Sequence, residues 1–420
     1  MNYVPNKGKE TAEMLKAAGV ASFDELFASV KPKLARKLNL SPPKSELELA
    51  GHMLELSGKN TLLKNFVGAG SYDHYIPSAV AHITSRSEFY TAYTPYQAEV
   101  SQGTLQVIYE FQSYMCLLTG MDVSNASMYD GASATAEAAF IACDITERSE
   151  IAVLNKLNPN YEKVLRTYCE SRGVKITGEL TQKSACVLVQ NPDFEGNVHE
   201  LEEFANRAHE AGALLVVSVA EPTSLAILKA PGECGADVVA GEAQGFGNPV
   251  SFGGPMLGYI AVKKDFVKRI PGRLCGMTTD SRGKKGFVLT LQAREQHIRR
   301  ERASCNICSN EALCALAATA YLALMGKTGL ANVAKLSYER AHELQKKLGE
   351  LGFALQNTKP FYNEFAVKCP IKPKKLIAAL EKRGIAAGLG IGEDRILICC
   401  TEKLSEQDVE DYVNVVRGLL

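Results

Sequence analysis

Short apolar runs alternate with amphipathic segments through the middle of the chain. Four runs are continuously apolar over most of their length: ACVLVQNP (residues 185–192), ALLVVSV (213–219), ADVVAGEA (236–243) and PMLGYIAV (255–262). Such runs predict strands that are buried on both faces of a sheet. The segment between the first two runs, NVHELEEFANRAHEAGA, has its apolar side chains on one helical face and ends near Gly212. The alternation predicts a largely parallel, helix-covered sheet, so we expect a large α/β domain over residues 65–329.

The first 64 residues show a different pattern, one of short helical segments. TAEMLKAAGV forms one amphipathic segment, and FDELFASV forms a second one that follows Ser22. Ser22 and Glu25 have the spacing of a capping box, which predicts a helix start at this point. Several prolines then interrupt helical continuation. We expect residues 1–64 to form an N-terminal helical extension that packs against a neighbour, because the segment is too small for an independent core.

The pattern changes again at residue 330, and residues 330–420 predict a small α+β domain. A polar helix precedes three strand candidates, GFALQN, NEFAVKC and ILICC, and two further helices, KPKKLIAALEKRG and SEQDVEDYVNVVRGLL. The stretch just before this domain, ALCALAATAYLALM (312–325), is the most apolar in the chain. It is shorter than the roughly 20 residues that a membrane span requires. We therefore expect a buried helix there.

The charge balance and the cysteines indicate which classes of protein this sequence does not fit. Lysine plus arginine and aspartate plus glutamate both number 47, so the net charge is zero. A nucleic-acid-binding protein needs a basic face that neutralises phosphates, and this composition indicates none. Twelve cysteines without a secretory signal indicate reduced thiols. We expect a cytoplasmic protein with neither a membrane segment nor a nucleic-acid partner.

Motifs for nucleotides and metals are incomplete in this sequence. The glycines that flank Phe246 lack the third glycine of a dinucleotide-binding fingerprint, and GLGIG (388–392) predicts a flexible turn. Cys305 and Cys308 have the CxxC spacing, but no second CxxC or histidine pair completes a set of four metal ligands. The histidines form no HExxH pair. We expect no metal site.

Three other segments contain residues suited to binding. The turn at residues 130–133 opens an alanine-rich helix, and its amide groups either hold an anion or are capped by Asp130 and Ser133. Residues 89–103, FYTAYTPYQAEVSQG, mix aromatic and polar side chains, which suits a site lining or an interface loop better than a core. A solvated loop is the alternative. Residues 66–77, FVGAGSYDHYIP, are a similar case.

Five long motifs resemble a single family. They are GAGSYDHYIP, YTAYTPYQAEVSQG, MYDGASATAEA, GFGNPVSFGGP and REQHIRRERASCNICSNEAL. The resemblance is to the N-terminal half of glycine decarboxylase, the P-protein of the glycine cleavage system, and it covers essentially the whole chain. In some organisms this enzyme consists of two polypeptides, and the chain is similar in length to the first of them. The resemblance implies the fold of pyridoxal-phosphate (PLP) dependent transferases of fold type I, with a large seven-stranded α/β domain, a small C-terminal domain and active sites at subunit interfaces.

The cofactor positions that the resemblance implies carry unsuitable residues. A fold-type-I enzyme needs a lysine that forms a Schiff base and an aspartate that keeps the pyridine nitrogen protonated. Against the pattern of the cofactor-binding partner, the aspartate position falls on Ser218 and the lysine position on Gln244. Serine carries no negative charge, and an amide nitrogen does not condense with an aldehyde. We therefore expect PLP on a partner subunit and no cofactor on this chain.

The resemblance also implies a complex and its substrates. A P-protein subunit of this kind is expected to meet a PLP-bearing second subunit, glycine and the lipoylated H-protein. The complex releases CO2 from glycine and passes the aminomethyl group to the lipoyl arm. The residues that the resemblance suggests for the glycine side of the partner's site, or for the channel leading to it, are Tyr93, Tyr96, Gln97, Glu99 and Ser101.

Other interpretations stay open at this point. A self-sufficient PLP enzyme of the same fold requires a lysine where Gln244 stands, and a pure scaffold subunit contributes nothing to the site. A set of basic residues either receives an acidic partner such as the H-protein or forms a solvated helix face: Lys284, Lys285, Arg294, Arg299, Arg300 and Arg302. Nearby Glu295 and Glu301 compensate part of this charge.

Overall fold

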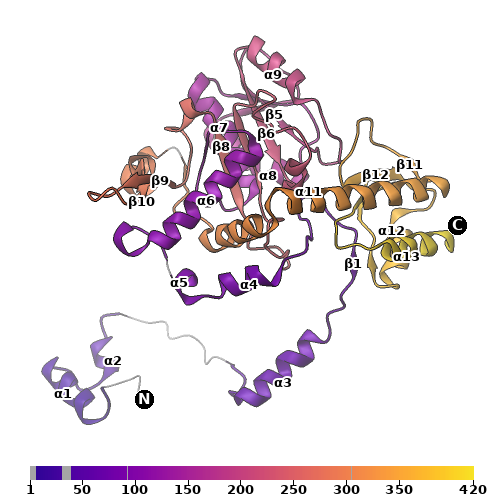
Figure 1. Cartoon of the computed structure of the whole chain (residues 1–420). Coiled ribbons are helices and arrows are strands. Elements are labelled where there is room, and N and C mark those ends of the chain that lie inside the picture. The colour runs from indigo at the N-terminus through magenta and orange to yellow at the C-terminus, as the bar shows by residue number, and fades with distance from the viewer. Residues whose placement is uncertain (1–5, 31–38, 92, 304) are drawn as a thin grey trace. The chain divides into compact units, whose positions relative to one another are not determined.

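The chain separates into two units of very different compactness. The structure, a computed structural model, describes residues 6–30, 39–91, 93–303 and 305–420. Contacts between residues divide it into Met1–Thr61 and Leu62–Leu420 (Figure 1). The division predicted from the sequence, with domain boundaries after residues 64 and 329, is not tested by these contacts and stays a prediction.

Among its described residues, 6–30 and 39–61, the first unit contains three helices that bury no side chain: α1 (Lys9–Ala17), α2 (Phe23–Leu26) and α3 (Glu46–Ser57). The Ser22 hydroxyl oxygen accepts the Glu25 N–H, as predicted, but the Glu25 carboxylate accepts the Ala21 N–H, so the box is incomplete. A complete capping box instead begins α3, at Ser45 and Glu48. Large apolar side chains such as Leu47 are exposed in this unit. Its packing against a neighbour stays a prediction.

A seven-stranded sheet forms the centre of the second unit. Its strands are β2 (Val123–Ser124), β3 (Glu150–Val153), β4 (Lys175–Thr177), β5 (Ser184–Gln190), β6 (Leu214–Val219), β7 (Val238–Glu242) and β8 (Gly258–Val262). Their order across the sheet is β2-β8-β7-β6-β5-β3-β4. β8 is antiparallel to both of its neighbours, and the other pairs are parallel. The four strands read from the apolar runs are β5 to β8, which confirms the predicted mostly parallel α/β sheet.

Helices cover both faces of this sheet. They include α6 (Gln102–Thr119), α7 (Gly131–Thr146), α8 (Pro159–Arg172) and α9 (Leu201–Glu210). α4 (Ser78–Thr84) adds Val80 to one of the apolar clusters, and the short α5 (Ser87–Tyr90) buries no side chain. Val187 and Val217 pack in one apolar cluster with residues of α6 and α9. Leu188 and Val216, the neighbours of those residues in sequence, pack in a second cluster with residues of α7 and α8. Successive side chains of a strand point to opposite faces, so both faces of the sheet are buried.

One long helix connects the seven-stranded sheet to a smaller, four-stranded sheet of the second unit. α11 (Ala312–Glu350) has non-helical backbone at Gly326, whose φ of 56° favours glycine, and appears as the long orange helix in Figure 1. Length and apolar composition alone would allow this helix to cross a membrane, but half of its most apolar window is buried inside the protein. Ala318 and Leu322 belong to the apolar cluster on one face of the large sheet, and Leu344 belongs to the cluster of the small one. The apolar stretch is therefore a core helix, as expected.

The small sheet contains four antiparallel strands in the order β11-β12-β15-β14. They are β11 (Ala354–Leu355), β12 (Glu364–Lys368), β14 (Leu389–Ile391) and β15 (Arg395–Cys399), and α12 (Pro373–Glu381) and α13 (Glu406–Arg417) pack with them. The prediction of a flexible turn for GLGIG was wrong in its central part, because Leu389 and Ile391 pair with β15. β1 (Lys64–Asn65) pairs with β13 (Ile385–Ala386), so the start of this unit lies beside its end.

A hairpin that the sequence pattern did not reveal completes the second unit. β9 (Leu274–Thr279) pairs with β10 (Lys285–Thr290), and the short α10 (Gln296–Arg299) follows. Cys275 and Phe287 of the hairpin pack on Leu105 of α6. The hairpin carries Lys284 and Lys285 and leads directly into the segment that contains Arg294, Arg299, Arg300 and Arg302. It therefore determines where these basic residues lie.

Candidate functional site

Ser218 lies at the carboxyl end of β6 and is fully buried. Its hydroxyl lies 2.8 Å from the Thr135 hydroxyl oxygen, and Thr135 in turn donates to the carbonyl oxygen of Gly131 over 2.8 Å. Because the Thr135 proton is directed to that carbonyl, Ser218 is the donor of the pair. The position is neutral and hydrogen-bonded within the chain.

Gln244 follows β7 and is 2% exposed. Its side-chain nitrogen donates to the carbonyl oxygen of Asn248 over 2.5 Å, and its side-chain oxygen accepts the Tyr72 N–H over 3.4 Å. Both ends of the amide are therefore used inside the protein. Lys263 and Lys264, the next lysines along the chain, lie beyond β8, where Lys263 pairs with Asp237.

The turn at residues 130–133 is closed by carboxylates of the chain itself. Asp130 accepts the Ser133 N–H over 2.8 Å and so caps α7 locally. The Gly131 N–H, another amide of this turn, donates to the Glu242 carboxylate over 2.8 Å. Of the two interpretations that the sequence left open, these contacts favour the capped helix.

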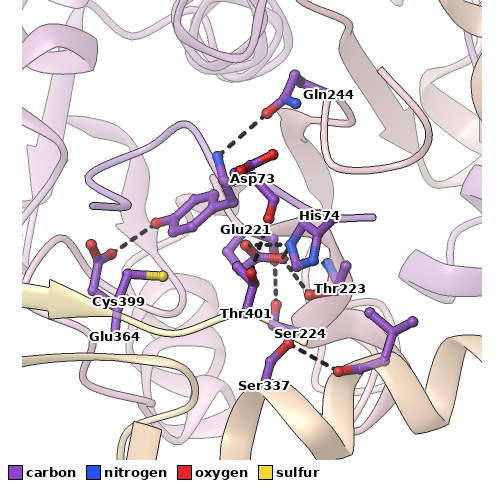
Figure 2. Close-up of polar contacts among 12 residues, drawn as sticks. Asp73, His74, Glu221, Thr223, Ser224, Gln244, Ser337, Glu364, Cys399 and Thr401 are labelled. Atoms are coloured by element: carbon purple, nitrogen blue, oxygen red, sulfur yellow. Dashed lines mark hydrogen bonds and ion pairs between the residues drawn. The ribbon is translucent and has the colours of Figure 1, made fainter. Parts of the chain in front are cut away.

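A buried ion cluster around His74 was not identified from the sequence (Figure 2). The two ring nitrogens of His74 lie 2.7 Å from Glu402 Oε2 and 3.2 Å from Glu221 Oε2. Burial lowers the pKa of His74, but the two carboxylates outweigh it and raise that pKa to about 10. The imidazolium therefore joins residues 66–77 to the segments that follow β6 and β15.

A third buried carboxylate, that of Glu364, extends the cluster toward Gln244. Glu364 accepts the Tyr72 hydroxyl over 2.9 Å and the Ala69 N–H over 2.6 Å, as Figure 2 shows in part. Burial raises the pKa of Glu364 to about 7. Tyr72 therefore contacts Glu364 through its hydroxyl and Gln244 through its backbone. The polar and aromatic composition of residues 66–77 was the one sequence signal for this cluster.

Four of the five candidate residues of the 93–101 segment are exposed, and the fifth is half-buried. Tyr93 is 80% exposed and Tyr96 is 53% exposed, and Gln97 and Glu99 are exposed as well. Ser101 is half-buried and precedes α6 without a side-chain capping bond. The segment contains the short helix η1 (Ala98–Val100).

Tyr96 is tied to a buried arginine. Arg273, which is 3% exposed, lies with its guanidinium carbon 5.6 Å from the Tyr96 ring centroid and with one nitrogen 3.4 Å from the hydroxyl. The same guanidinium donates to the carbonyl oxygen of Cys308 over 2.9 Å. The His297 ring meets the Tyr96 ring edge-on. The structure therefore joins two motifs far apart in sequence, 89–103 and 294–313, at Tyr96.

Comparison with known proteins decides the family. The model of the glycine cleavage system P-protein family matches residues 1–416. The chain belongs to this family.

Relatives and solved structures agree with the assignment. The P-protein chain is 47% identical to a probable glycine dehydrogenase (decarboxylating) subunit 1 of Moorella thermoacetica, over 100% of both chains. It is equally identical to the protein of that name from Desulfitobacterium hafniense, over 98% of both. A crystal structure of a glycine decarboxylase (P-protein) in inhibitor-bound form superimposes with a TM-score of 0.93 at 41% identity over 100% of both chains. The predicted role as a subunit of glycine decarboxylase is confirmed.

More distant structures show the fold alone. Glutamate decarboxylase of Lactobacillus brevis superimposes with a TM-score of 0.67 at 10% identity, covering 94% of this P-protein chain and 97% of that chain. The predicted PLP-transferase fold of type I is confirmed. The residues at the cofactor positions do not fit the cofactor, however, because Ser218 and Gln244 are neutral and are hydrogen-bonded to other groups of the chain.

Proposed function

We propose that this chain is the P-protein subunit that does not hold PLP, and that it completes an active site whose cofactor belongs to a partner subunit. One observation supports the proposal above the others. Ser218 and Gln244 replace the required aspartate and lysine, are at most 2% exposed, and have their polar atoms bound inside the chain. PLP supplies the electron sink for decarboxylation when it is held by a lysine and an acidic partner, and these two residues offer neither.

The partners follow from this assignment. The proposed complex contains a PLP-bearing second subunit, takes glycine as substrate and hands the aminomethyl group to the lipoylated H-protein. A cytoplasmic location remains our expectation. The exposed basic residues Lys284, Lys285, Arg299, Arg300 and Arg302 are available to an acidic partner. Arg294 differs from them, because its guanidinium donates to the carbonyl oxygens of Ile270 and Gly272 inside the chain.

The 93–101 segment is the proposed contribution of this chain to the partner's site. Tyr93 and Tyr96 present aromatic area and a hydroxyl at the surface, and such side chains combine apolar contact with a polar tip. Gln97, Glu99 and Ser101 add hydrogen-bonding groups along the same segment. Their proposed task is to shape and hydrogen-bond the glycine side of the partner's site or the channel that leads to it. Arg273 keeps Tyr96 in place for this role.

Turnover of the reconstituted complex tests the segment. Tyr96→Phe and Glu99→Gln remove one hydrogen-bonding or charged group each, and we expect each to lower glycine turnover about 10-fold. Tyr338→Phe and Glu339→Gln are matched controls on α11, where both side chains are exposed, and they should leave turnover unchanged. Unchanged turnover in the first pair would favour a scaffold that contributes nothing to the site.

A further inference from the structure

The carboxylate of Glu242 sits where the ends of three elements meet. It accepts the Gly131 N–H at the start of α7 over 2.8 Å, the Leu257 N–H before β8 over 2.7 Å and the Gln244 N–H after β7 over 3.0 Å. Three backbone donors that converge on one anionic group resemble the way proteins bind free anions. Glu242 is 2% exposed, so these amides rather than water solvate it.

A fourth polar group is directed to the same place. The Tyr161 hydroxyl on α8 is buried and has no hydrogen-bond partner among the described residues. It lies 2.3 Å from where a Cβ of Gly131 would be, and the Cβ of Glu242 lies 2.9 Å from that point. Only glycine at position 131 therefore leaves room for both side chains beside the first turn of α7.

We infer that Glu242 is an internal ligand, which fills with its own carboxylate an anion position built by α7, α8 and the ends of β7 and β8. The inference deepens the proposed function and rests on it. Burial raises the pKa of Glu242 to about 7, although the three N–H groups act to lower it, so the side chain is ionised mainly above that pH. A phosphate group that approached this turn would meet amides that are already bound and, above that pH, a carboxylate of the same charge. The chain is then closed to a phosphorylated cofactor at a third position, beyond Ser218 and Gln244. Unlike those two, Glu242 excludes the ligand rather than merely failing to hold it.

Removing the carboxylate should expose the position to a free anion. We expect Glu242→Ala, in the complex with the partner subunit, to lower the thermal unfolding midpoint of this chain by about 5 °C. Inorganic phosphate should then raise that midpoint by about 3 °C more than sodium chloride of equal ionic strength. The wild type should show no such difference. Glu364→Ala is the matched control, because Glu364 is equally buried but accepts only one backbone N–H and a tyrosine hydroxyl.

Specific outcomes would overturn the inference. Equal responses to phosphate in all three proteins, or no response in any of them, would show that Glu242 occupies no anion position. If the alanine variant does not fold, Glu242→Gln keeps the side-chain volume but cannot accept all three N–H groups. Its midpoint should fall as well, and a wild-type midpoint would contradict the inference. The proposed function fails on a different result, a pyridoxyl group bound covalently to the wild-type chain, so the two failures are distinguishable.

Discussion

The two regions of this chain that were candidates for chemistry differ in how their polar groups are satisfied. Ser218, Glu242 and Gln244, which we term the closed site, are buried and bound to groups of the same chain. The 93–101 segment exposes tyrosines and an acidic residue to the surface. A buried polar group with all of its partners in place stabilises a fold, whereas exposed aromatic and polar groups are available to a second molecule. Substitutions in the closed site should therefore change stability, and substitutions in the segment should change turnover.

The largest stability effect is expected at Ser218. Ser218→Asp places a carboxylate at a fully buried position with no cation provided for it, which should cost about 4 kcal/mol of unfolding free energy. Urea denaturation measures the change. Ser218→Ala loses only the hydrogen bond to Thr135 and should cost about 1 kcal/mol. Equal stabilities for the aspartate variant and the wild type would mean that the closed site has room and solvent for a charge.

The ion cluster beside the closed site should give the next largest effect. His74→Gln leaves Glu221 and Glu402 facing each other without the imidazolium, at a cost of about 3 kcal/mol. The pKa of His74 is raised from 6.5 to about 10 in the fold, so its contribution is complete below pH 6.5. It should be lost as pH rises toward 10. Denaturation of wild type and variant between pH 6 and 10 should show converging curves, with His82→Gln on α4 as an exposed control.

Glu364 should show the opposite relation between charge and stability. Burial raises its pKa from 4.5 to about 7, so the folded chain holds a proton that the unfolded chain has released between these values. Wild-type stability should therefore fall by about 3 kcal/mol from this group as pH rises from 4.5 to 7, and this contribution should stay constant at higher pH. Glu364→Gln should remove that part of the pH dependence. A parallel pH profile for the two proteins would show that Glu364 is ionised throughout.

The smallest stability change is expected in the exposed segment. Tyr93→Phe and Gln97→Ala should stay within about 0.5 kcal/mol of the wild type in urea, because both side chains are exposed. Turnover of the complex should fall nonetheless. A large loss of stability with unchanged turnover would show that the segment stabilises the fold and does not contribute to the reaction, which would contradict the difference drawn between the two regions.

Patterns of apolar residues were sufficient to predict the seven-stranded sheet but not the buried polar clusters beside it. β5 to β8 were visible because continuous burial on two faces leaves a continuous apolar run. β14 was missed because its glycines resemble a turn, and only the pairing with β15 makes it a strand. The contacts of His74 with Glu221 and Glu402 join residues 147 and 328 positions apart, and no local spacing records them.

The candidate site could be predicted from the sequence only where a residue is chemically unsuited to the role that the fold requires at its position. Ser218 and Gln244 stand out because neither side chain can perform the task that the fold requires of it. Glu242 was not identified, because a glutamate at the end of an apolar strand gives no sign that three backbone amides converge on it. The segment from Tyr93 to Ser101 was recognised by its composition, which does not reveal that Arg273 contacts Tyr96.

Borohydride reduction of the assembled complex tests the central claim most directly. The chain is co-expressed with its candidate partner, the complex is reduced, and the intact polypeptides are separated and weighed by mass spectrometry. The account predicts a pyridoxyl group on the partner and an unmodified mass for this chain. A reduced pyridoxyl adduct on any lysine of this chain would contradict it.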